Sequence, residues 1–285
     1  MSLTTSRNSL PPSRESCSSD TPECNMRKRI LTVLAIIAAS VLLLPAQKQP
    51  YMPGERVTYQ IRYGPVGSGQ ALLEMKEAYY KGQPVWHAVV SGQTTGLADK
   101  LYKVRDVYES YIDPATDLPV FSIRNISEGR YRKYNEVGFD QKARADSTLV
   151  FSDLTGNHAG PKGLLDIVSC FYWFRKYFLA TADTLVPGET YKMMTWFADE
   201  LYPIVLRYKG TEVIKTKGGK LTCHRFHPVT EVGRVFETEE DMVMWFTADE
   251  NFLPVKVRFD IFVGSFHVDM TSYEGLRVPL KYNNQ

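Results

Sequence analysis

The alternation of apolar and polar positions predicts β-strands over most of the chain beyond residue 50. In the stretch RVTYQIRY at 56–63, an apolar side chain occupies nearly every second position. A period of two is typical of a strand with one buried and one solvated face. Lys81-Gly82 separates two such stretches, and glycine favours tight turns because it accepts a positive φ without steric cost. The pattern therefore predicts a mainly β protein built from hairpins.

Three short motifs occur twice in the same order, and each second copy lies about 135 positions after the first. The pairs are PGERVTYQIRY at Pro53 with PGETYKMMTWF at Pro187, KGQPVWH at Lys81 with KGGKLTCH at Lys217, and DLPVFSIR at Asp117 with NFLPVKVR at Asn251. Each LPV places proline where a strand begins, and a missing amide donor is tolerated there. We therefore expect an internal duplication that forms two related curved antiparallel sheets, over about 53–150 and 187–278.

An amphipathic segment between the two halves, at about 161–180, predicts one main connecting helix. A proline suits its first position, and Arg175 and Lys176 favour its C-terminal end electrostatically. Its apolar stripe contains Leu164, Leu165, Val168, Phe171, Tyr172 and Phe178. We expect this stripe to face the sheets or a ligand held between them, and packed core is the commoner use of such a face.

The first 46 residues have the composition of a leader. Residues 1–25 are rich in Ser, Thr and Pro and lack an apolar period, which predicts disorder and suggests that Met26 is the true initiator. Three basic residues and the apolar run 30–44 follow, as in a signal peptide, and the run is shorter than the ~20 residues of a spanning helix. We expect cleavage near Ala46, with an uncleaved anchor as the alternative. Residues 47–285 would then form a single exported β-rich domain in the periplasm or cell envelope.

The charge balance bears on the partners of the exported part. The chain has 34 basic and 32 acidic residues, and the leader accounts for five basic and three acidic ones, which leaves 29 of each. A neutral body gives no electrostatic signature for nucleic acid or a strongly anionic membrane. We therefore expect no nucleic-acid partner, and membrane contact only through the leader.

Two cysteines, Cys170 and Cys223, remain after the leader. Disulfides persist in exported proteins, so one bridge between them is possible. Cys170 lies in the apolar stretch IVSCFYWF, where a buried thiol acting as a small hydrophobe is the alternative. Neither cysteine suggests a metal site, because His224 and His227 near Cys223 lie three apart on a predicted strand and face opposite ways.

Few residues suggest other chemistry. Arg124 and Arg132 belong to a basic patch that would suit an anionic head group. The strand alternation sends Arg132 and Lys133 to opposite faces, and a solvated strand face is the commoner role of such a patch. The acidic run 237–241 would hold a paired acid and base, although it too is commonly a solvated face. The glycine-rich stretch 64–69 does not open a helix, so no phosphate loop is expected. We identify no catalytic residue, no metal ligand and no cofactor.

The order of these landmarks resembles a family of exported bacterial proteins known as domain of unknown function 3108 (DUF3108). The resemblance covers GERVTYQIRYGPVGSGQA near the start, LYKVRDVYESYID with DLPV, the helix DIVSCFYWFR, and WFTADENFLPVKVRFDIFVGSF near the end. These motifs are structural, so the resemblance implies a compartment and a β-rich fold but no activity. At the level of fold alone, the LPV hairpins also resemble the half-barrel lipoprotein carriers of the periplasm.

These observations favour a non-enzymatic binding or envelope-maintenance factor with a hydrophobic ligand or an envelope protein as its partner. A hydrolase that acts on an envelope polymer through carboxylates is an alternative, and a structural module that binds a partner by its sheet edges is another. An apolar cavity would favour the first function, two facing carboxylates the second, and a closed core with an open edge the third.

Overall fold

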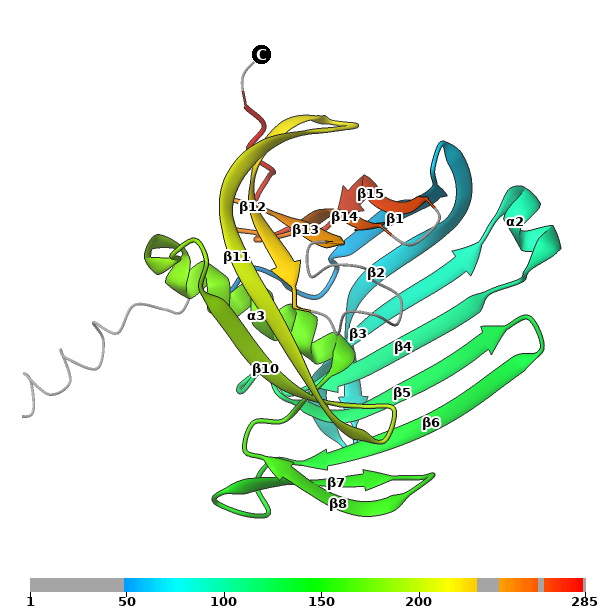
Figure 1. Ribbon diagram of the computed structural model, residues 1–285. Helices are drawn as coiled ribbons and strands as arrows, with labels where there is room; N and C mark the ends of the chain where they lie inside the picture. Colours follow the sequence, from blue (N-terminus) through cyan, green and yellow to red (C-terminus); the bar gives the residue numbers. More distant parts are fainter. Residues whose placement is uncertain (1–48, 230–240, 261–263, 284–285) are drawn as a thin grey trace, which may run out of the picture. The chain divides into compact units, whose positions relative to one another are not determined.

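The computed structural model describes residues 49–229, 241–260 and 264–283, and most of them lie in strands (Figure 1). The first strands are β1 (Arg56–Tyr63), β2 (Val66–Tyr80), β3 (Gln83–Thr94), β4 (Arg105–Ile112), β5 (Pro119–Glu128), β6 (Tyr131–Asp140), β7 (Ser147–Ser152), β8 (Gly156–Pro161) and β9 (Leu165–Asp166). They are followed by β10 (Thr190–Phe197), β11 (Glu200–Thr216), β12 (Gly219–Pro228), β13 (Met242–Thr247), β14 (Pro254–Asp260) and β15 (Ser265–Glu274). The helices are α2 (Gly96–Leu101), α3 (Ile167–Thr181) and the short η1 (Ala182–Thr184).

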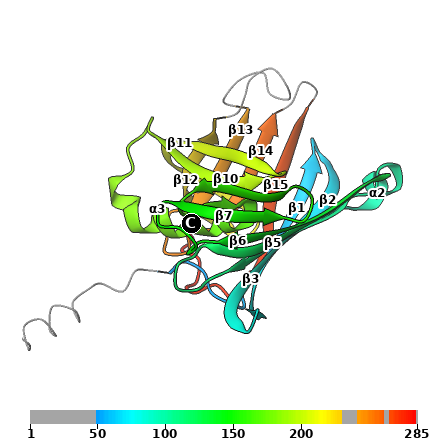
Figure 2. The same ribbon diagram turned by 90° about the horizontal axis from the view of Figure 1, so that it is seen from below.

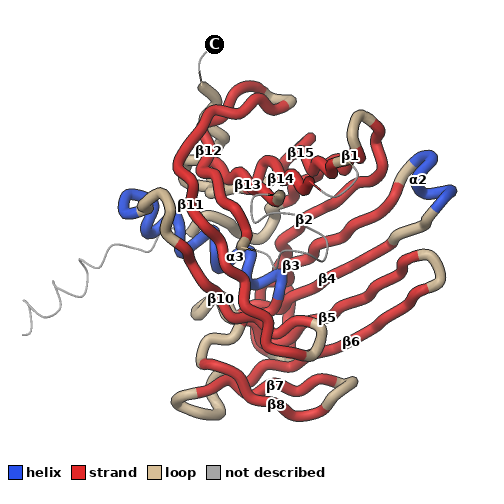
Figure 3. The backbone as a smooth tube through the Cα atoms, in the orientation of Figure 1, coloured by secondary structure: helices blue, strands red, loops and turns tan. Residues whose placement is uncertain are grey.

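All of these strands belong to one sheet, in the order β8-β7-β6-β5-β4-β3-β2-β1-β15-β14-β13-β12-β11-β10-β9. The mainly β architecture with one main helix is confirmed. The two expected sheets are joined into one, because β1 pairs with β15 as well as with β2. This pairing leaves no open edge where the halves meet, and an open edge would expose unpaired backbone groups. Figure 3 shows the strands as a continuous curved layer around α3.

The two halves share local features at the positions where the motifs repeat. Gly54 and Gly188 have φ values of +98° and +99°. The amide of Gly54 donates to the carbonyl of Met75 at 2.8 Å, and the amide of Gly188 donates to that of Tyr208 at the same distance. Pro119 and Pro254 begin β5 and β14. These features agree with a duplication, which stays a prediction.

The main helix α3 begins later than the sequence pattern indicates. Pro161 ends β8, and Leu165 pairs with β10 in the short parallel strand β9. The helix starts at Ile167 and is capped by Asp166, whose carboxylate accepts from the amides of Val168 and Ser169 at 2.8 and 2.9 Å. An aspartate in this position satisfies amides that lack an intrahelical partner, and it therefore sets the first turn.

Helix α3 packs on one face of the sheet and contacts both halves. Val168 and Tyr172 pack with Met75, Ala88 and Ile112 of the first half. Phe174 and Phe178 pack with Phe226 and Phe246 of the second half, with ring centroids 4.9 to 5.2 Å apart in three of these contacts. The side that carries Met75, Ala88, Phe226 and Phe246 is called the helix-bearing face below. Figure 2 shows α3 beneath the second half of the sheet.

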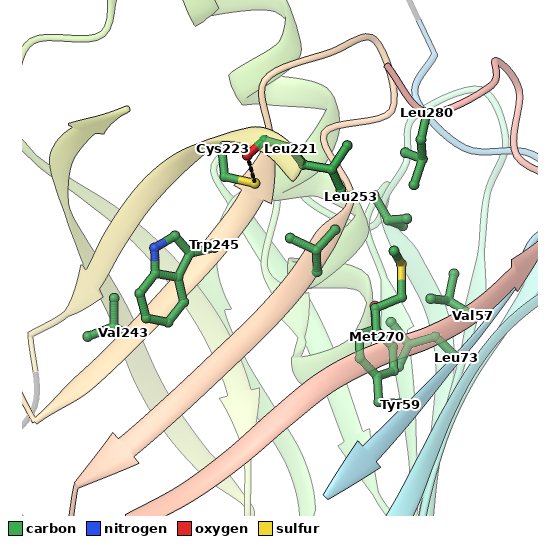
Figure 4. Close-up of a cluster of buried hydrophobic side chains, with 11 residues drawn as sticks. Val57, Tyr59, Leu73, Leu221, Cys223, Val243, Trp245, Leu253, Met270 and Leu280 are labelled. Carbon is green, nitrogen blue, oxygen red and sulfur yellow. Dashed lines mark hydrogen bonds between the residues drawn. The ribbon is translucent and has the colours of Figure 1, made fainter. Parts of the chain in front are cut away.

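A further buried cluster lies where the halves meet (Figure 4). It combines Val57 and Leu73 of β1 and β2 with Met270 of β15 and with Leu253, which precedes β14. The hydroxyl of Tyr59 in this cluster donates to the carbonyl of Pro254 at 2.8 Å, across 195 positions of sequence. The core therefore continues through the junction and does not divide into two centres.

The hairpin β10–β11 folds onto the strands at the other end of the sheet. Trp196 contacts the ring of His158, with centroids 4.8 Å apart, and packs with Val137 and Val150. Asp199 at its tip accepts from the hydroxyl of Ser152 at 2.6 Å. The sheet is therefore not closed by backbone pairing, and side chains hold its two ends together.

Candidate functional site

An apolar strip crosses the helix-bearing face at the junction of the two halves. Its members come from the adjacent strands β13, β14, β15 and β1, and they lie opposite one another in two rows. Met244, Val257, Val268 and Ile61 form one row, and Met242, Phe259, Phe266 and Tyr63 form the other. Cross-strand partners share a face, and Met244 lies two positions from Phe246, which places the strip on the same side as α3.

The strip continues the core but is less buried than the core. Met244 packs against the cluster of Phe226 and Phe246, and Val268 packs against that of Val57 and Met270. All eight side chains are nevertheless half-buried or exposed, and Tyr63 exposes 38% of its surface. Eight adjacent apolar side chains that lack full cover form a candidate surface for an apolar ligand.

The predicted apolar stripe is placed almost wholly in the core, although Leu164 and Leu165 precede α3 and do not belong to the helix. Leu164, Val168, Tyr172 and Phe178 expose at most 3% of their surface. Phe171 is half-buried and packs against all three core clusters that α3 contacts. Among these predicted ligand-binding residues, Phe171 therefore retains accessible surface, and the ligand-binding role of the stripe stays a prediction.

The structure does not bring the two predicted head-group residues together. Arg124 lies opposite Asn135 on the helix-bearing face, with its guanidinium 5.3 Å from the ring centroid of Phe197. Arg132 lies three positions from Asn135 on β6 and therefore faces the other side, where it donates to the carbonyls of Gly129 and Tyr131. Because they lie on opposite faces, the two arginines cannot bind the same anionic head group.

A small cavity of about 30 Å³ with a mixed polar and apolar lining lies between Arg124, Asn135, Trp196 and the start of α3. Asp166 borders it, and burial raises the pKa of this carboxyl group, although hydrogen bonds from Ser110 and the helix amides oppose the shift. The indole N–H of Trp196 has no hydrogen-bond partner among the described residues. This volume suits one or two water molecules and is too small for a lipid head group.

The two cysteines are free thiols in different core clusters, so the alternative of a disulfide does not hold. The sulfur of Cys170 lies 3.6 Å from that of Met193, whereas Cys223 packs beside Leu221 (Figure 4). Burial raises the pKa of each thiol to about 12. Both side chains therefore act as small hydrophobes, which is the other reading that the sequence left open.

One pair of carboxyl groups was missed by sequence reasoning. Glu128 ends β5 and hydrogen-bonds through its side chain to Asp106 of β4, and burial together with Asp106 raises the pKa of Glu128. No local pattern predicts this contact, because it depends on strand register. Of the acidic run 237–241, residues 237–240 lie outside the described residues.

The fold and the site define a protein with an open, curved, mainly antiparallel sheet, one main helix on one face and an apolar strip beside that helix. The family model described as protein of unknown function (DUF3108) matches residues 58–271, and the chain belongs to this family.

Among solved structures, the chain is similar to the crystal structure of a beta-barrel-like protein of domain of unknown function DUF1849 from Brucella abortus. The TM-score is 0.52 at 10% identity, over 78% of this chain and 97% of that chain, so the likeness concerns the fold alone. It agrees with the expected likeness to half-barrel proteins. A comparison with curated proteins gives no match. Among the described residues, no helix has the length and apolar character needed to span a membrane.

Proposed function

We propose that this protein is a non-enzymatic binding factor of the bacterial cell envelope that holds the acyl chain of a lipid on the apolar strip. The observation that carries the proposal is the half-exposed double row Met244–Val257–Val268–Ile61 and Met242–Phe259–Phe266–Tyr63. Two rows across four strands make a band about 14 Å long at the usual strand spacing, which suits an extended chain rather than a compact ring.

The strip has the physical properties of a lipid-binding surface. Each methylene removed from water contributes about 0.8 kcal/mol, so even part of an acyl chain supplies useful affinity. Met242 and Met244 adapt to ligands of different shape because their thioether side chains are flexible and polarisable. The strip lies on strands rather than loops, so little conformational entropy is lost on binding.

The hydrolase alternative receives less support from the described residues. Asp106 and Glu128 are in direct hydrogen-bonding contact. Glycosidase carboxyl groups stand about 5 to 9.5 Å apart, so that a sugar or a water fits between them. A pair in contact leaves no such space, and the raised pKa of Glu128 is explained by its burial and by its acidic neighbour.

Export to the envelope is part of the proposal. It is supported by the basic start and the apolar run before Ala46, while the residues beyond Ala46 include 29 basic and 29 acidic ones. A neutral body is compatible with a lipid bound through its chain, without a strongly charged receptor for the head group.

Binding of a fluorescent fatty-acid probe to protein purified from its native host tests the proposal. The double variant Val257→Thr/Val268→Thr places two hydroxyls in the strip at nearly unchanged volume. We expect it to weaken binding at least about tenfold, because a buried hydroxyl without a partner costs ~1–3 kcal/mol.

Val89→Thr is the matched control, because Val89 is a half-buried strand valine that pairs with Glu74 on the opposite face. We expect this variant to bind the probe as the wild type does. Native mass spectrometry should also show a lipid-sized mass bound to the wild-type protein. The proposal would be contradicted if the probe failed to bind, or if Val89→Thr lost as much affinity for the probe as the double variant.

A further inference from the structure

The sheet carries a hollow of about 280 Å³ on the side opposite to α3, over strands β1 to β4. Its walls are the side chains of Arg56, Thr58, Gln70, Leu72, Ser91, Gln93, Arg105 and Val107, and the backbone around Ala71, Gly92 and Asp106 forms its floor. Leu73 of β2 belongs to the core, so its neighbour Leu72 points to the other face. The hollow, called the polar hollow below, is therefore separated from the apolar strip by the sheet itself.

Strand register places these side chains in two rows. Gln70, Gln93 and Arg105 lie directly opposite one another on β2, β3 and β4. The first row continues through Gln60 of β1, which lies opposite Gln70. Thr58, Leu72, Ser91 and Val107 form the second row. Polar groups are thus repeated at the strand spacing of about 4.8 Å on a rigid support.

The polar groups of the hollow are available for a ligand. Within the described part of the chain, the side chains of Gln70, Gln93 and Ser91 form no hydrogen bond to another protein group. A carboxamide offers two N–H donors and a carbonyl acceptor, and a hydroxyl is both donor and acceptor. This inventory matches a ligand whose neighbouring groups are themselves both donors and acceptors.

Both guanidinium groups of the hollow already have a carboxylate neighbour. Arg105 donates to the carboxylate of Asp99 at 2.7 Å, and the guanidinium of Arg56 lies 3.6 Å from the carboxylate of Glu74, whose other oxygen pairs with Lys76 at 3.0 Å. Asp106 borders the floor through its backbone, and its carboxylate accepts from the amide of Ser127 at 2.9 Å. A bound anion would therefore have to compete with these carboxylates for the guanidinium groups, which disfavours an anion site.

We infer that the polar hollow binds a neutral saccharide. Adjacent hydroxyls of a sugar would pair with the carboxamides of Gln70 and Gln93 and with Ser91, while Leu72 and Val107 contact the apolar C–H faces of the ring. The volume is at the low end of ligand pockets, which suits one or two sugar units of a longer chain. This site lies on the opposite face from the apolar strip and does not depend on the proposed lipid binding.

Titration of the ¹⁵N-labelled full-length protein with maltoheptaose and with chitotetraose tests the inference. We expect at least one saccharide to produce saturable shifts of the amides around Ala71, Gly92 and Asp106, with a dissociation constant in the millimolar range or below. Gln70→Ala and Gln93→Ala should each weaken binding about threefold to tenfold, as the loss of one or two neutral hydrogen bonds predicts.

Gln83→Ala is the matched control, because Gln83 is also an exposed glutamine on β3 but lies outside the hollow. It should leave the affinity unchanged. Sodium sulfate serves as the anion control. Saturable shifts with sulfate but with neither saccharide would overturn the inference in favour of an anion site. The inference would be overturned outright if neither saccharide shifted these amides, or if Gln70→Ala and Gln93→Ala left saccharide affinity unchanged.

Discussion

Arg175 of helix α3 and Glu55 of the N-terminal segment form a bidentate ion pair in the interior of the protein. The two N–O distances are 2.5 and 2.9 Å, and the side chains expose 0% and 1% of their surface. Arg175 also donates to the carbonyls of Asn251 and Pro50 at 3.0 to 3.2 Å. Burial alone would lower the pKa of Arg175, but the attraction of Glu55 outweighs burial and raises it. The pair thus joins the segment before β1, the helix and the turn before β14.

Removal of Glu55 alone should therefore strongly reduce the stability of the fold. Glu55→Ala leaves a buried guanidinium without its counter-charge, and we expect it to lower the free energy of unfolding by about 3–5 kcal/mol. Glu189→Ala is the matched control, because Glu189 occupies the same place in the second PGE motif but is exposed. Its effect should stay within about 0.5 kcal/mol in chemical denaturation. Equal losses in the two variants would contradict the importance of the ion pair.

Phe171→Ala should destabilise the protein by about 3–5 kcal/mol, because the ring connects three core clusters. Thermal melts with and without envelope lipid extract would separate this structural role from a role in ligand binding. Phe178→Ala is the control, because Phe178 is fully buried in one cluster. We expect that lipid will not raise the melting temperature of either variant. If lipid raised the melting temperature of Phe171→Ala but not that of Phe178→Ala, Phe171 would instead contact the ligand.

Gly54→Ala and Gly188→Ala should destabilise the protein by similar amounts, about 1–3 kcal/mol each. Both glycines have φ near +100°, which is strained for alanine although no atom blocks the added methyl group. Gly92→Ala serves as the control, because its methyl group also meets no atom and its φ is not positive. A strong effect at one of the two turns and none at the other would argue against equivalent halves.

Stability should fall as the pH decreases through about 6.5, in part because of His224. Burial lowers the pKa of this imidazole below its ordinary value of about 6.5. The unfolded chain therefore binds a proton at a higher pH than the folded protein, which favours unfolding on acidification. His224→Gln should reduce the slope of unfolding free energy against pH between about 7 and 5. An unchanged slope would show that His224 does not contribute.

Protein recovered from its native host should lack the residues up to about Ala46. Intact-mass measurement and fractionation of the opened envelope decide this, and we expect a soluble species that begins close to residue 47. Retention of the apolar run 30–44 in a membrane fraction would replace secretion by anchoring.

The sequence alone determined the type of most elements. Alternation predicted the strand at 56–63, and the two LPV motifs marked strands that do begin at Pro119 and Pro254. These signals are local, because each depends on neighbouring side chains and on the φ of one proline. The helix start was predicted too early, although Asp166 with Ser169 three positions later is a local capping signal that would have placed it correctly.

Only the tertiary structure decided which strands are neighbours, and with them the candidate sites. The apolar strip exists because β1 pairs with β15 across some 200 positions, which brings Ile61 opposite Val268. The polar hollow likewise depends on the register that sets Gln70 opposite Gln93. A strand pattern specifies which side chains share a face but not which strand lies beside it, since that choice is made by the packing of all strands around α3. The chain therefore carries its fold class in local patterns and its binding surfaces in long-range register.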